Sequence, residues 1–331
     1  MSLLNRVVLG LGLALLPAGA HAENTLLNAS YDVSRELYKE INPAFAAQWK
    51  KEKGTDITVN QSHGGSTKQA LAVANGLEAD LVTFNQATDL DFLADKGVVA
   101  KDWKSKFPNE AAPYTTTSVF IVRKGNPKGI KDWDDLAKAG TSVVIPNPKT
   151  SGNGRYTYLA AWGYELDKSK SDEKARAFVT SLFANVPVFD GGGRGATTTF
   201  TQRAVGDVLV TFENEVGLLK AEFGDNFDVV YPTLSIEAAP PVAVVETVTA
   251  KRGTAETAKA YLDFLYSPEG QKIIAKHGFR PRDAASLAAA QLPTIKTFRV
   301  ENVFGSWAKA QKEHFADGGI YDQITVASKS N

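Results

Sequence analysis

The sequence has 331 residues, in which 37 basic side chains balance 37 acidic ones, and it contains no cysteine. A chain without net charge lacks the basic surface that nucleic acids and anionic membranes require. The absence of cysteine excludes disulfides, thiol chemistry, a lipid-modified cysteine and the cysteine ligands of zinc sites.

The first 22 residues have the pattern of a secretory signal peptide. Arg6 supplies a positive start, residues 7–16 form an apolar run, and residues 20–22 (AHA) give the small-x-small pattern of a cleavage site. The apolar run is shorter than the roughly 20 residues that span a bilayer, and no later stretch qualifies. We therefore expect a mature chain that begins at Glu23 and is soluble in a bacterial periplasm. An uncleaved anchor is the alternative.

From residue 25 onward, strand-like and helix-like segments alternate. Strand patterns at 25–29, 57–59 and 81–84 are each followed by a helical pattern, and the alternation continues beyond residue 140. Such alternation predicts an α/β fold with largely parallel sheets. Pro43 is expected to kink or split the first helix, which Gly54 ends. A strand is expected at 241–248.

The mature chain of 309 residues exceeds the size at which single cores stop growing, about 250 to 300 residues, which favours two lobes. A long β-branched run from Tyr114 to about residue 122 and the segment after Pro240 are predicted to cross between them. We expect residues 23–115 and 241–331 to form the first lobe and residues 116–240 the second. The tail at 297–322 is expected to pack on the first lobe.

Three loops rich in Ser and Gly each precede a predicted helix, at 61–66, 147–155 and 190–195. A helix start presents several NH groups without intrahelical acceptors and the positive end of the helix dipole, which together suit a small anion. One loop belongs to the first lobe and two belong to the second. An anion bound by all three would hold the lobes closed over it.

The sequence is poor in catalytic groups. After removal of the signal peptide the histidines are His63, His277 and His314, and none has the spacing of an HExxH metal site. The HGG at 63–65 resembles an esterase oxyanion loop, but no GxSxG follows. The glycines at 191–195 lack a following GK[ST]. We therefore expect neither an enzyme nor a bound cofactor or metal.

Charged residues beside these loops have two readings. Arg155 and Arg194, just inside helix starts, form surface salt bridges, or they fix the loops and add positive potential behind the NH groups. Asp32 and Glu213 are candidate anchors for these arginines, or they are ordinary caps and exposed acids.

Five motifs are spread along the mature chain: SYDVSRELY, QSHGGSTKQA, NPKTSGNGR, GGRGATTTF and SPEGQ. Together they resemble the periplasmic sulfate- and thiosulfate-binding proteins of ABC importers. The resemblance implies a type II periplasmic binding protein fold, in which two α/β lobes joined by two hinge crossings close on a dehydrated oxyanion. It also implies delivery to the permease subunits of an ABC transporter and a monomeric protein.

The resemblance implies a set of site residues as well. The ligand would be held mainly by backbone NH groups and a few hydroxyl groups: the NH of Ser66, the hydroxyl or NH of Ser151, and the NH groups of Gly152, Asn153 and Gly193. The resemblance also implies a set of residues that lie behind these donors, orient the loops and distribute the charge of the anion. They are Asp32, His63, Arg155 and Arg194.

Phe212 differs from the sulfate-dedicated branch of this family. The resemblance implies that those proteins have a tryptophan at this position, whose indole NH donates a hydrogen bond to the anion. Phenylalanine cannot donate a hydrogen bond, and an apolar wall suits the terminal sulfur of thiosulfate. We therefore expect binding of thiosulfate, with sulfate also bound. The alternatives are a same-fold binding protein for molybdate, phosphate or an organosulfonate, and an enzyme on the same scaffold.

Overall fold

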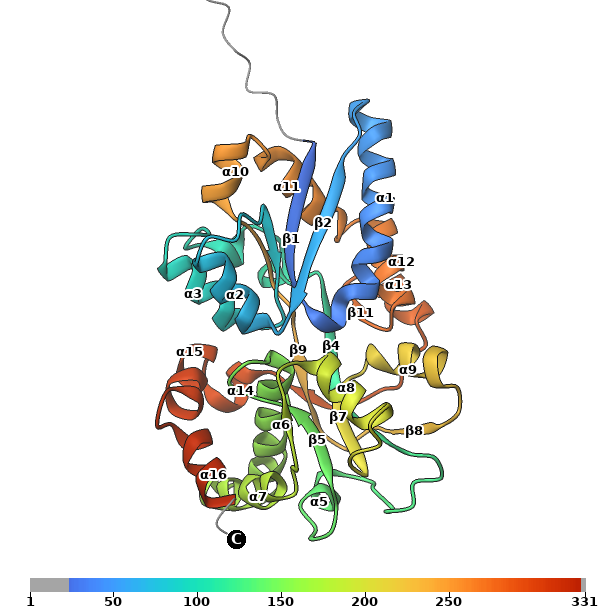
Figure 1. The fold of residues 1–331 in the computed structure, drawn as a ribbon, viewed down its shortest axis with the longest axis vertical. Helices are drawn as coiled ribbons and strands as arrows, with labels where there is room; N and C mark the ends of the chain where they lie inside the picture. Colours follow the sequence, from blue (N-terminus) through green and yellow to red (C-terminus); the bar gives the residue numbers. More distant parts are fainter. Residues whose placement is uncertain (1–23, 329–331) are drawn as a thin grey trace, which may run out of the picture.

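The computed structural model describes residues 24–328. The predicted signal peptide therefore lies outside the described residues. The described chain forms two α/β lobes, drawn one above the other in Figure 1. Among residues 24–328, no helix combines the length and the apolar character that crossing a bilayer would need.

The upper lobe is built on a four-stranded sheet in the order β10-β3-β1-β2. Strand β1 (Thr25–Tyr31) is parallel to β2 (Thr58–Gly64) and β3 (Leu81–Thr83), whereas β10 (Val242–Val244) is antiparallel to β3. Because β1, β2 and β3 are parallel, their carboxyl ends lie at one edge, which faces the lower lobe (Figure 1). The 3-10 turn η1 and the helices α2 and α3 follow these ends directly.

Helix α1 (Arg35–Lys53) runs unbroken through Pro43, so the expectation that this proline splits the helix is wrong. The buried residues of α1 recur at helical spacing and pack into the first core: Leu37, Tyr38, Ile41, Phe45 and Trp49. Burial of this face outweighs the one backbone hydrogen bond that proline removes. The helix ends at Gly54, whose φ of 74° is left-handed as predicted.

The lower lobe is built on a mixed sheet in the order β12-β9-β4-β7-β5-β6, with β8 and β11 also pairing with β4. Its strands are β4 (Tyr114–Arg123), β5 (Val143–Pro146), β6 (Phe189–Asp190), β7 (Val208–Phe212), β8 (Phe227–Val230), β9 (Ser235–Ala238), β11 (Arg280–Pro281) and β12 (Thr297–Phe298). Strand β5 is parallel to β6 and β7. The loops after these strands therefore reach the edge that faces the upper lobe.

The remaining elements cover the two sheets. They are η1 (Asp32–Ser34), α2 (Ser66–Ala74), α3 (Ala87–Asp95), η2 (Trp103–Ser105), α4 (Pro108–Ala111), α5 (Trp133–Leu136), α6 (Gly152–Ser169), α7 (Asp172–Ala184), α8 (Gly193–Thr201), α9 (Glu215–Phe223), α10 (Glu246–Arg252), α11 (Ala255–Phe264), α12 (Pro268–Lys276), α13 (Ala284–Ala289), α14 (Val300–Phe304), α15 (Trp307–Ala310), the π-helix η3 (Gln311–Phe315) and α16 (Ile320–Ser328).

Both expected crossings are present. Strand β4 begins at Tyr114, which is buried in the first core, and continues into the second sheet. Strands β9 and β10 lie in different sheets, and only residues 239–241 separate them. The strand expected at 241–248 ends at Val244, because helix α10 starts at Glu246.

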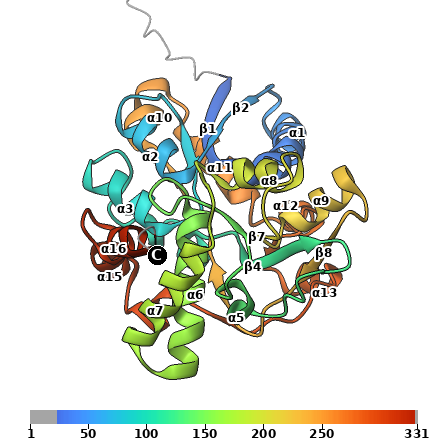
Figure 2. The same cartoon turned by 60° about the horizontal axis from the view of Figure 1, so that its bottom comes forward.

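The chain then crosses a third time, because the tail packs on the second lobe and not on the first. Its buried aromatic residues join the second core: Phe304, Trp307, Phe315 and Tyr321. The ring centroid of Tyr158 in α6 lies 5.1 Å from that of Phe315 and 6.0 Å from that of Tyr321. Helix α16 lies alongside α7 in both views (Figures 1 and 2). The expectation that this segment packs on the first lobe is therefore wrong.

Candidate functional site

The three predicted helix starts converge where the lobes meet. Gly65 immediately precedes α2 in the upper lobe. A Cβ atom added there would lie 2.6 Å from the carbonyl oxygen of Thr150 and 2.9 Å from that of Gly191, and these two residues belong to the loops before α6 and α8. A Cβ atom at Gly193 would lie 3.2 Å from Nδ2 of Asn153. The two lower loops therefore also approach each other.

These helix starts leave backbone donors free. The first helical hydrogen bonds of α2, α6 and α8 are donated by the NH groups of Gln69, Arg155 and Ala196. The NH groups before them have no acceptor inside an α-helix. Among the described residues no acceptor is found for the NH groups of Ser66, Gly152, Asn153 and Gly193. The site thus offers donors from both lobes.

The Ser66 hydroxyl is occupied by protein groups. Its Oγ donates to Oδ2 of Asp89 at 2.6 Å and accepts from the NH of Asn85 at 3.2 Å. Asp89 also accepts from Thr67 Oγ1 at 3.0 Å and from Gln86 Nε2 at 2.9 Å. Burial raises the pKa of Asp89, while Arg155 and these hydrogen bonds oppose the shift. The carboxylate of Asp89 therefore holds the start of α2 in place.

Arg155 links the two lobes. Its Nε donates to the carbonyl oxygen of Pro148 at 2.8 Å, and its Nη1 lies 3.4 Å from Thr88 Oγ1 in the upper lobe. The side chain is buried, and its charge faces Asp89. The interpretation of Arg155 as part of a surface salt bridge is therefore wrong. Its contacts are consistent with the alternative, in which Arg155 fixes the loop.

Arg194 also reaches across the cleft. Its NH donates to Oδ2 of Asp32 at 3.2 Å, and its guanidinium lies 2.7 Å from Glu36 and 3.5 Å from Glu215. Asp32 thus anchors Arg194, as one reading of the sequence held. Burial raises the pKa of Glu215 to about 8, although Arg194 opposes the shift.

Glu213 does not anchor either predicted arginine. Its carboxylate accepts two hydrogen bonds from Arg280, at 2.7 Å from Nε and 2.8 Å from Nη2. The residue is buried, so it is not an exposed acid either. The pair joins the start of α9 to strand β11 and thereby supports the hinge region.

His63 lies near the end of β2, and its Nδ1 has no hydrogen-bond partner among the described residues. Burial and the nearby positive charge of Arg35 lower the pKa of His63 to about 4. The imidazole is therefore neutral at pH 7 and adds no charge to the site. Residues 24–328 hold no group of three or more acidic or histidine side chains that could hold a metal ion.

Comparison with known proteins places the chain in a family. Residues 26–280 match the model of the bacterial extracellular solute-binding proteins. The chain belongs to that family. The two-lobed binding-protein fold expected from the sequence is therefore confirmed for this solute-binding protein.

Its relatives have closely related names. The chain is 57% identical over 321 residues to a thiosulfate-binding protein of Pseudomonas aeruginosa, covering 96% of each chain. It is 52% identical over 323 residues to a sulfate-binding protein of Escherichia coli, covering 96% of this chain and 98% of that protein. The solved structure of the sulfate-binding protein SubI from Mycobacterium tuberculosis H37Rv matches with a TM-score of 0.80 at 33% identity, over 87% of this chain and 98% of that one.

Phe212 ends strand β7 and is fully buried in this solute-binding protein. Its ring centroid lies 5.8 Å from that of Tyr156, in an edge-to-face arrangement, and Tyr156 packs in the same way against Trp307 at 5.1 Å. The preceding residue, Thr211, lies 3.4 Å from the side-chain amide of Asn153. Phe212 thus packs against Tyr156, about one turn into α6.

The two arginines near the helix starts of the solute-binding protein are balanced by acidic residues. Arg155 faces Asp89, and Arg194 faces the carboxylates of Asp32 and Glu36 and the carboxyl group of Glu215. Neither guanidinium is left as an uncompensated positive charge. The two arginines therefore add little net positive potential, whereas the NH groups and the helix dipoles favour an anion.

Sequence reasoning missed two upper-lobe residues. A Cβ atom at Gly152 would overlap the side chain of Asn85, and Asp89 holds Ser66 as described above. Both residues follow strand β3, whose carboxyl end meets the cleft. Their position after a parallel strand could have identified them from the sequence, because ligands bind at the carboxyl ends of parallel strands. Lys149, in the loop before α6, was also given no role.

Proposed function

We propose that this chain is a periplasmic binding protein that captures thiosulfate or sulfate between its lobes and delivers it to an ABC permease. The observation that carries the proposal is the convergence of three helix starts from both lobes, with NH groups that lack acceptors. The names of the relatives give the class of anion. The anion would accept hydrogen bonds from the NH groups of Ser66, Gly152, Asn153 and Gly193 and from the hydroxyl group of Ser151, beside the wall formed by Phe212.

Selection between oxyanions follows from the donors. Sulfate and thiosulfate carry no proton at neutral pH, so every oxygen accepts hydrogen bonds. Monohydrogen phosphate carries one OH, and leaving that donor without an acceptor in a buried site costs about 1 to 3 kcal/mol. The carboxylate of Asp89 already accepts hydrogen bonds from Ser66, Thr67 and Gln86, which leaves it little capacity to accept that proton.

The lobes would open and close about the crossings. We place the hinge at the boundaries 115/116 and 240/241 and assign the tail to the second lobe. Closure brings Asp32 to Arg194 and Asp89 to Arg155, so both second-lobe arginines gain a first-lobe carboxylate as the anion is enclosed. His63 stays neutral behind the α2 start.

The protein would act outside the cytoplasm and without chemistry of its own. The signal pattern at residues 1–22 supports export to the periplasm with cleavage before Glu23. The family supports a binding protein and not an enzyme. We infer that it works as a monomer with the permease and ATP-binding subunits of an importer.

A thermal-shift screen tests the proposal. Sulfate, thiosulfate, phosphate, molybdate and an organosulfonate are each added to dialysed protein in an anion-free buffer. At a thousandfold excess over Kd, a ligand stabilises the folded protein by about 4 kcal/mol, which raises Tm by several degrees. We expect that shift with sulfate and thiosulfate. An equal or larger shift with phosphate or molybdate would refute this choice of ligand.

A further inference from the structure

The loop before α6 is held from outside the site by the C-terminal tail. Lys149 Nζ donates to the carbonyl oxygens of Phe315 and Ala316, at 3.0 and 3.3 Å, and to Oδ2 of Asp322 at 3.0 Å. An ammonium group has three donors, and these three contacts use them all. Lys149 therefore has no donor left for a ligand, although it lies in the anion-binding motif.

The tail is built to receive this ammonium group. The carbonyl of Phe315 closes the π-helix η3, and carbonyls at a helix end lack partners within the helix. The Asp322 carboxylate is fixed by the NH of Gly318, 2.8 Å from Oδ2. Backbone and side-chain acceptors thus meet at one point, opposite Lys149.

Two further contacts join the same loop and the same tail. Tyr321 Oη lies 3.4 Å from Oδ1 of Asn147, which also accepts the NH of Lys149 at 2.8 Å. At the other end of the loop, the guanidinium carbon of Arg155 lies 5.4 Å from the ring centroid of Phe315. Both ends of the loop therefore rest on residues 315–322.

The loop needs such support because of its own composition. The segment Ser151 to Gly154 contains two glycines, and glycine loses more backbone freedom on ordering than any other residue. The donors of Gly152 and Asn153 bind an anion well only when they point at one place. The backbone hydrogen bonds within residues 147–155 are donated by the NH groups of Thr150, Ser151 and Arg155, so none of them holds the NH groups of Gly152 and Asn153.

We propose that Lys149 is a positioning residue, which tethers the anion-binding loop to the C-terminal tail and thereby sets how tightly the anion is held. The tail belongs to the binding machinery although it supplies no group to the ligand. This inference rests on the proposed function, because it concerns the same site.

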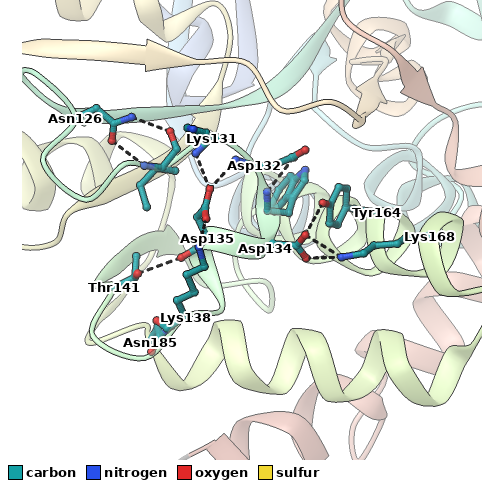
Figure 3. Close-up of polar contacts among 12 residues, drawn as sticks. Asn126, Lys131, Asp132, Asp134, Asp135, Lys138, Thr141, Tyr164, Lys168 and Asn185 are labelled. Carbon is teal, nitrogen blue, oxygen red and sulfur yellow. Dashed lines mark hydrogen bonds and ion pairs between the residues drawn. The ribbon is translucent and has the colours of Figure 1, made fainter.

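The test compares four variants in full-length mature protein. Lys149→Met removes the donors and keeps the stem, Lys149→Arg keeps a multidentate cation, and Asp322→Asn removes one charge of the tether. The control is Lys168→Met at the opposite end of α6, about 24 Å along the helix. Lys168 pairs with Asp134 at 2.8 Å near the surface (Figure 3).

Calorimetry with thiosulfate and sulfate gives Kd, and hydrogen exchange of the ligand-free protein reports on the NH groups of residues 150–154. We expect roughly tenfold weaker binding in Lys149→Met, the loss of about one charge-assisted hydrogen bond, together with faster exchange at 150–154. Lys149→Arg should recover most of the affinity, Asp322→Asn should weaken binding, and Lys168→Met should match the wild type.

Contrary outcomes are specific. Wild-type affinity and exchange in Lys149→Met would overturn the tether. Tighter binding in Asp322→Asn would also overturn it, because it would mean that Lys149 acts on the anion by its charge alone. If Lys149→Met does not fold, the affinity and hydrogen exchange of Asp322→Asn test the tether instead. If the wild type binds neither anion, the proposed function fails, while the exchange of residues 150–154 still tests the tether.

Discussion

Replacing Gly65 by alanine is the sharpest perturbation of the closed cleft. The added Cβ atom would lie 2.6 Å from the Thr150 carbonyl oxygen and 2.9 Å from that of Gly191, closer than Cβ atoms approach other atoms in folded proteins. Both oxygens are backbone atoms of the opposite lobe, so the conflict exists only when the lobes are together. The φ of Gly65 is −58°, which alanine adopts without strain.

The size of the effect follows from the two overlaps. Inserting a methyl group into a packed contact costs about 1 to 3 kcal/mol. With two backbone conflicts we expect about 3 kcal/mol, which weakens binding roughly a hundredfold. Because an open cleft relieves the overlap, Tm of the ligand-free protein should stay near that of the wild type.

The matched control is Gly64→Ala in the same loop. There the added Cβ atom would lie 3.0 Å from Nε2 of Gln69, the end of a flexible side chain in the same lobe. Calorimetry with thiosulfate and scanning calorimetry without ligand complete the assay. Wild-type affinity in Gly65→Ala would refute the reasoning, and so would an equal loss in Gly64→Ala.

Three further predictions concern the wall and the titrating groups. Phe212→Trp should raise the affinity for sulfate relative to thiosulfate by about tenfold, the contribution of one charge-assisted hydrogen bond. If calorimetry finds an unchanged ratio of the two Kd values, Phe212 only provides an apolar surface and does not select the ligand. Affinity should be flat from pH 5 to 7, because the lowered pKa of His63, about 4, keeps it neutral there; a slope that His63→Ala abolishes would contradict this. Glu215 is the opposite case, since its pKa is raised to about 8, so its contribution to stability is lost as pH rises from about 4.5 toward 8. In thermal melts, the Tm of Glu215→Gln should therefore rise relative to that of the wild type as pH increases over that range. A wild-type Tm that rises relative to the variant would mean that Arg194 stabilises the charged carboxylate.

Local composition was enough to predict the helix starts. Glycine turns and the strands before them are properties of a few neighbouring residues, and the loops before α2, α6 and α8 occur where the sequence indicates. The left-handed end of α1 at Gly54 follows from the same local chemistry. The alternation of strands and helices then places all three loops at sheet edges, because parallel strands end together.

The destination of the tail was not predictable in this way. Its aromatic residues show only that it needs a core, and both lobes offer one. The choice depends on the rings of Tyr158 and Phe183, which are distant in sequence and receive Phe315 and Tyr321. The same limit applies to Arg155, whose position at a helix start indicates neither its burial nor its contact with Thr88. Asp89 was missed because an acid early in a helix resembles an ordinary dipole-stabilising residue.

Competitive calorimetry tests the central claim most directly. Protein dialysed free of sulfate and phosphate is titrated with thiosulfate, alone and in the presence of sulfate or of phosphate. The donor-lined cleft predicts micromolar or tighter binding, about −8 kcal/mol or better, with sulfate competing strongly and phosphate hardly at all. Phosphate that competes as well as sulfate, or no heat with either sulfur oxyanion, would contradict the account.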